Sequence, residues 1–133
     1  MRQPFGQAPG AAEIEALASG ALARLPAAFR DHLGDIVLCV EELADAATLA
    51  ELGIEDGFEL TGLYEGVPLG EKGMADSGSL SDRIRLFRLP ILDEWIARGD
   101  ETLEHLVVHV LIHEVGHHFG LSDAAMAALE DSA

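Results

Sequence analysis

One stretch near the end of the chain, His109-Val-Leu-Ile-His113-Glu114-Val-Gly-His117-His118-Phe-Gly120-Leu-Ser-Asp123, decides how the remaining residues are interpreted. Its first part overlaps a longer segment, residues 101–119. When the residues of this segment are placed about 100° apart, as in a helix, apolar side chains lie on every side. That pattern predicts one long helix. A helix that is apolar all round is normally buried, so we expect this helix to be central, packed on a sheet and covered by other elements.

His113, Glu114 and His117 form the motif H-E-x-x-H, which is typical of zinc metallohydrolases. His113 and His117 are four residues apart, so their rings project from one helical face toward one tetrahedral ion. Glu114 is rotated about 100° from His113 but only about 60° from His117, at the border of that face. This placement suits a general base that acts on water rather than a ligand. The pattern therefore predicts His113 and His117 as Zn²⁺ ligands and Glu114 as the catalytic residue.

Asp123 is the best candidate for a third zinc ligand. On an unbroken helix it would lie about 240° round from His117 and point away from the ion. The chain must therefore leave the helix and double back, and Gly120 stands where a left-handed turn permits this. Two simpler interpretations stay open: Gly120 ends the helix, and Ser122 or Asp123 caps a last helix over 124–130. The combined pattern favours Asp123 as a metal ligand.

Neighbouring residues are not expected to be ligands. His109 lies about 6 Å along the axis from His113, too far for a ligand role to be assumed. A packing, supporting or solvated role is expected for it and for His105. His118 points away from His113, Met126 is expected in the core, and Glu130 is a less favoured alternative ligand.

Composition favours a soluble, intracellular protein. Of 133 residues, 49% are apolar, and Asp and Glu number 24 against 8 Lys and Arg, for a formal charge of −16. Such a charge disfavours nucleic acid as a partner and favours divalent cations and basic or neutral substrates, although an acidic surface also commonly serves solubility. The single cysteine, Cys39, cannot form an internal disulfide and is expected in the core. No signal peptide or membrane span is evident, so we expect a cytoplasmic protein without membrane contact.

The other segments predict an α+β domain. Residues 1–10 are expected to form a loose tail and 11–133 a single domain. Periodicity and the positions of Gly and Pro predict further elements. Helices are expected at 11–25, 27–33 and 91–98, a short helix or ordered loop at 45–53, strands at 36–40, 60–64 and 83–88, and a surface loop at 68–82.

Three blocks of the sequence resemble successive blocks of the bacterial zincin-like metallopeptidase family. They are Gly62-Leu-Tyr64-Glu-Gly66-Val-Pro68-Leu, Asp82-Arg-Ile-Arg-Leu-Phe-Arg88-Leu-Pro90, and the motif from His113 to Asp123. The resemblance runs from about residue 11 to the C-terminus. It implies a minimal zincin-like fold: a small mixed sheet of about three strands on a central, buried active-site helix with flanking helices. It also implies zinc bound by His113, His117 and Asp123, with Glu114 catalytic, but it supplies no substrate.

Larger zincins bind an extended peptide along an edge strand. Here the alternating charges of residues 83–88 suggest that segment as the edge strand. Tyr64 is interpreted either as a half-buried strand residue or, less favourably, as a phenol that stabilises an oxyanion. Few residues follow Asp123, so we expect an open cleft or a protein partner that completes it.

The favoured function is a zinc-dependent metallopeptidase acting on a peptide or protein, with Glu114 as general base. The alternative is a zinc-binding interaction or regulatory module with little or no catalysis. A zinc-dependent ribonuclease is the least favoured possibility, because such enzymes have Gly where this chain has Glu114, and because the charge disfavours RNA.

Overall fold

The computed structural model describes residues 7–33, 36–66 and 82–132. The predicted loop at 68–82 lies outside the described residues except for Asp82, as do residues 1–6 of the predicted tail. The described helices are α1 (Ala11–Arg24), α2 (Ala27–Leu33), α3 (Ala46–Leu52), the 3₁₀ helix η1 (Gly57–Glu59), α5 (Arg88–Arg98), α6 (Leu103–Phe119) and α7 (Asp123–Ser132). In the part of the chain that the structure describes, no helix has the length and hydropathy needed to cross a membrane.

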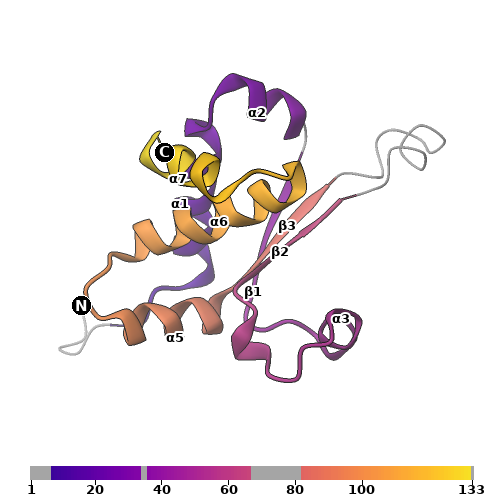
Figure 1. Cartoon of the computed structure of the whole chain (residues 1–133). Coiled ribbons are helices and arrows are strands. Elements are labelled where there is room, and N and C mark those ends of the chain that lie inside the picture. Colours follow the sequence, from indigo (N-terminus) through magenta and orange to yellow (C-terminus); the bar gives the residue numbers. More distant parts are fainter. Residues whose placement is uncertain (1–6, 34–35, 67–81, 133) are drawn as a thin grey trace.

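Three short strands form a mixed sheet (Figure 1). β1 (Val37–Glu41) pairs in parallel with β3 (Arg83–Phe87), and β2 (Gly62–Glu65) pairs with β3 antiparallel, so the order is β1-β3-β2. The prediction that residues 83–88 form an edge strand is therefore wrong. This strand is central, and β2 lies at the edge on which α6 packs. The α+β architecture itself agrees with the prediction.

Arg85 is a charged residue in the central strand, and its hydrogen-bond partners explain why this position is stable. Its side chain is only 7% exposed. The guanidinium donates hydrogen bonds to carboxylates of both neighbouring strands, Glu41 at 2.9 and 3.0 Å and Glu65 at 3.3 Å. It also donates to Asp45, the N-cap of α3, at 2.9 Å and to the Thr48 hydroxyl within α3 at 3.0 Å. A buried cation is stable only when paired in this way.

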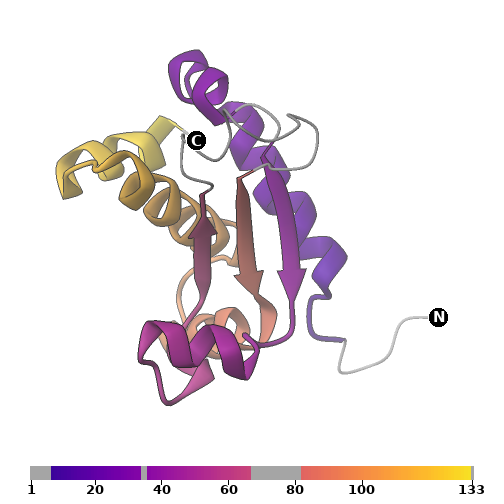
Figure 2. The same cartoon turned by 90° about the vertical axis from the view of Figure 1, so that its right-hand side faces the viewer.

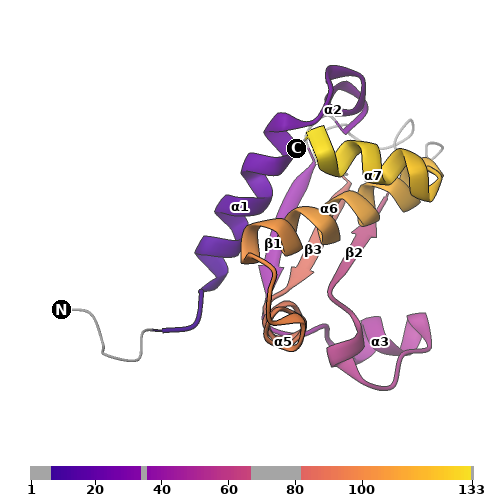
Figure 3. The same ribbon diagram turned by 60° about the vertical axis from the view of Figure 1, so that its left-hand side comes forward.

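α6 is the central helix, as its apolar sequence predicts. Its buried residues lie on every side: Leu106, Val107, Val108, Val110, Leu111, Ile112 and Val115. One side packs on Ile84 and Leu86 of the sheet, and α1 covers another with Ile14, Ala18 and Ala21. Figure 3 shows α6 crossing the sheet with α1 and α7 beside it.

The face of the sheet opposite α6 carries charged residues. The strand register places Cys39, Arg83 and Arg85 on this face, which Figure 2 views directly, with α3 at one end of the strands. Arg83 pairs with Glu65 at 2.6 Å. Cys39 is half-buried here, so the prediction of a core position for it is wrong.

Candidate metal centre

The end of α6 doubles back at Gly120, as the sequence predicts. Gly120 is left-handed, with φ 67° and ψ 33°. The next backbone N–H, from Leu121, donates to the carbonyl of Gly116 at 2.9 Å. Ser122 caps the start of α7, because its hydroxyl accepts a hydrogen bond from the N–H of Ala125 at 3.1 Å. Both simpler interpretations, a glycine helix end and a serine helix cap, therefore hold, and the reversal makes Asp123 the first residue of α7.

His113 and His117 project from successive turns of α6. Their ring centroids are 6.1 Å apart and their planes meet at 87°. His113 is half-buried and His117 is exposed, so the pair faces from the core toward solvent. Burial lowers the pKa of His113, which favours the neutral imidazole that a metal requires.

The side chain of Glu114 extends from α6 toward the edge strand β2. A Cβ added at Gly62 would be 3.3 Å from Cγ of Glu114, so the glycine lets strand and helix approach here. The Phe87 N–H donates to the Thr61 carbonyl, and the alternation of antiparallel bonds then turns the backbone of Gly62 and Tyr64 away from β3. Burial raises the pKa of Glu114, while the Tyr64 backbone N–H acts in the opposite direction. A raised pKa makes the carboxylate a better proton acceptor.

Asp123 is exposed at the start of α7. Its negative charge acts to raise the pKa of His113, though less than burial lowers it, so the carboxylate lies within electrostatic range of that ring. Among the described residues, the structure does not draw the donor atoms of His113, His117 and Asp123 together to within 4.8 Å of one another. The role of Asp123 as third ligand stays a prediction.

A family model described as zincin-like metallopeptidase matches residues 33–133. The chain belongs to this family. Comparison with curated proteins gives no match. Family membership implies a bound metal, typically zinc, and the chemistry of the residues present suits one: two imidazoles four residues apart on a helix, with the carboxylates of Glu114 and Asp123 on the same helix and just after its reversal.

A second group of potential ligands spans α6 and α7; of its members the sequence favoured only His113, with Glu130 a less favoured alternative and His109 not expected to bind the ion. Among the residues that the structure describes, one set of three potential ligands has donor atoms all within 4.8 Å of one another: His109, His113 and Glu130. Nδ1 of His109 lies 2.7 Å from Oε1 of Glu130. The ring centroids of His109 and His113 are 4.2 Å apart. One sequence feature could have indicated a role for His109 in this group: the spacing of four residues is repeated, from His109 to His113 and from His113 to His117.

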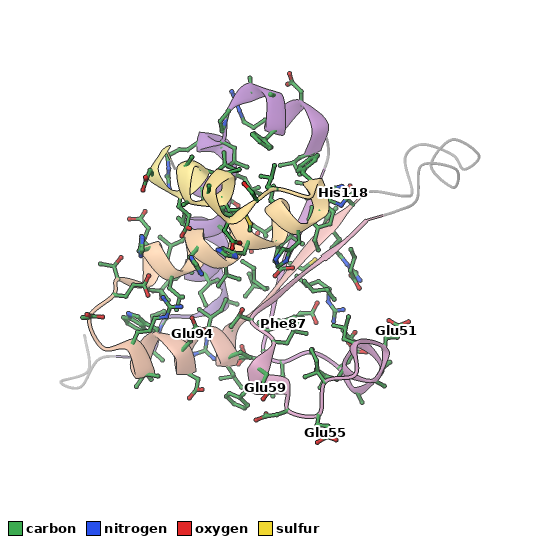
Figure 4. All side chains as sticks on the ribbon, in the orientation of Figure 1. Glu51, Glu55, Glu59, Phe87, Glu94 and His118 are labelled. Atoms are coloured by element: carbon green, nitrogen blue, oxygen red, sulfur yellow. The ribbon has the colours of Figure 1, made fainter. Side chains whose placement is uncertain are left out.

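His118 belongs to a separate cluster at the end of α6, beside the strands (Figure 4). Its ring stacks on Tyr64 with centroids 4.0 Å apart. The Tyr64 hydroxyl donates to buried Asp82 at 2.7 Å, and burial together with this carboxylate raises the pKa of the phenol. Because the phenolic proton already has a partner, the geometry favours the structural interpretation of Tyr64.

Proposed function

We propose that the protein is a zinc-dependent metallopeptidase, with Glu114 as the general base. The observation that carries the proposal is the position of Glu114, half-buried between the paired histidines of α6 and the outward-facing backbone of β2. His113, His117 and Asp123 would hold the ion. Bound zinc supplies Lewis acidity, which activates water and polarises a carbonyl at neutral pH.

The protein's own groups would then perform the remaining steps. β2 is the edge strand beside Glu114, and an extended peptide would pair with its outer backbone groups, apart from the Tyr64 N–H, which already acts on Glu114. Glu114 takes a proton from the attacking water and returns it to the departing amine, so no net proton is consumed at the carboxylate. Burial raises the pKa of this carboxyl group and thereby strengthens it as a base.

The test is Glu114→Gln, assayed against a diverse peptide library after zinc loading. Zinc binding should persist, whereas hydrolysis should fall by about 10²–10⁴-fold, the usual contribution of a general base. Glu104→Gln is the matched control, because it makes the same chemical change at an exposed position of α6. Full hydrolysis by the Glu114 variant would refute the mechanism. If the zinc-loaded wild type cleaves no peptide, the zinc-binding module becomes the better description.

A further inference from the structure

α7 lies along α6 in the opposite direction (Figures 1 and 3). The two helices touch where Gly116 meets Met126, a buried residue of α7. From His109 to His117 the rise along α6 is about 12 Å, and from Asp123 to Glu130 along α7 it is about 10.5 Å. The reversal at Gly120 thus places Asp123 toward the His117 end of the histidine row and Glu130 at its His109 end.

The row of three histidines consequently contains two overlapping pairs, and each pair has a carboxylate of α7 at its own end. The downstream pair is His113 with His117, near Asp123. The upstream pair is His109 with His113, and here the contact is direct, because Glu130 is 2.7 Å from His109. The side chains of His109 and Glu130 are 33% and 16% exposed, so this group is partly shielded from solvent.

The upstream group has the chemistry of a zinc site. Two imidazoles and one glutamate are a known set of three protein ligands for zinc. Donor atoms about 2.1 Å from a tetrahedral ion lie about 3.4 Å apart, so a set within 4.8 Å closes with small side-chain rotations.

We propose that His109, His113 and Glu130 form a second divalent-cation position, suited to zinc, one helical turn upstream of the His113–His117 pair. A neutral imidazole offers one acceptor nitrogen, so His113 serves one ion at a time. The two positions are therefore alternatives, and an ion held upstream withdraws His113 from the pair beside Glu114. The upstream position itself does not depend on the proposed peptidase activity, whereas its inhibitory effect does.

Equilibrium dialysis against Zn²⁺, followed by metal analysis, tests the proposal without an activity assay. Wild type should bind one equivalent. His117→Ala should still bind one equivalent, now upstream. Adding His109→Ala or Glu130→Gln to His117→Ala should weaken binding by at least about tenfold, the lower end of what even a supporting group contributes to a metal site. Adding His105→Ala, an exposed histidine of the same helix, should leave zinc binding unchanged.

Thermal unfolding in chelator shows that each variant is folded before zinc is added. The proposal is overturned if His117→Ala binds no zinc, or if its binding survives both upstream substitutions. Two equivalents on wild type would refute the sharing of His113. These outcomes are distinct from failure of the proposed function, which appears as hydrolysis that does not depend on Glu114.

Discussion

Gly116 controls how closely α7 approaches α6, and G116A tests this contact. A Cβ added at Gly116 would lie 2.3 Å from Sδ and 2.6 Å from Cγ of Met126. Optimal contacts between heavy atoms are about 3.5–4.0 Å, so the overlap exceeds 1 Å. Met126 is only 3% exposed, and moving its Cγ displaces the whole side chain.

The expected magnitude follows from two opposing terms. Overpacking a core costs about 1–3 kcal/mol, and replacing Gly by Ala inside a helix returns about 1 kcal/mol. We therefore expect G116A to lower the free energy of unfolding by about 1 kcal/mol. In the background of M126A the overlap is absent, and the same substitution should stabilise by up to about 1 kcal/mol. The coupling between the two sites should thus be about 1–3 kcal/mol.

Urea unfolding of the four proteins in this cycle measures that coupling. G20A is the control, because Gly20 lies within α1 and an added Cβ meets only the end of the Arg24 side chain, at 3.2 Å. It should gain the helix propensity without a packing loss. If G116A were stabilised as much as G20A and showed no coupling to Met126, the docking of α7 at Gly116 would be refuted.

Two further predictions concern groups around the sheet. Y64F removes the hydrogen bond to Asp82 and should lower the free energy of unfolding by about 1.5–3 kcal/mol, while hydrolysis is retained. A loss of about 10²–10³-fold in kcat would instead indicate that the phenol donates a hydrogen bond to an oxyanion. D45N keeps a side-chain oxygen for the cap of α3 but removes the charge near Arg85. The hydrogen bond from Thr48, and then Arg85, lowers the pKa of Asp45 in the folded state, so the carboxylate stabilises the fold above its unfolded pKa of about 3.9. The stability difference between wild type and D45N, measured by unfolding from pH 7 downward, should therefore shrink as the pH falls below about 4; a constant difference would contradict this assignment.

Local sequence signals predicted much of the fold. The uninterrupted apolar surface of the long helix indicated a central position, and Gly120 indicated a chain reversal, because both depend on nearby residues. The order of the strands in the sheet depends instead on residues far apart in the sequence. Arg83 and Arg85 suggested an edge, but carboxylates from Glu41 and Glu65 on the neighbouring strands make the central position stable.

In the candidate site, too, features that depend on nearby residues could be predicted from the sequence, and those that depend on packing between distant segments could not. The placement of Glu114 beside the histidine pair follows from helix geometry alone. The proximity of Glu130 to His109 does not, because it depends on the direction and register in which α7 packs against α6. That register is determined by contacts such as Gly116 with Met126, which sequence spacing does not reveal.

The backbones of the two carboxylate residues of α7 move together. Asp123 and Glu130 belong to one helix, so sliding or tilting α7 on α6 moves them as a rigid body. An advance that brings one carboxylate toward the histidine row also displaces the other. If the two proposed positions hold metal, the packing of α7 on α6 would determine which carboxylate faces the histidines. Substitutions in the buried face of α7 would then shift occupancy between the two positions without changing a proposed ligand.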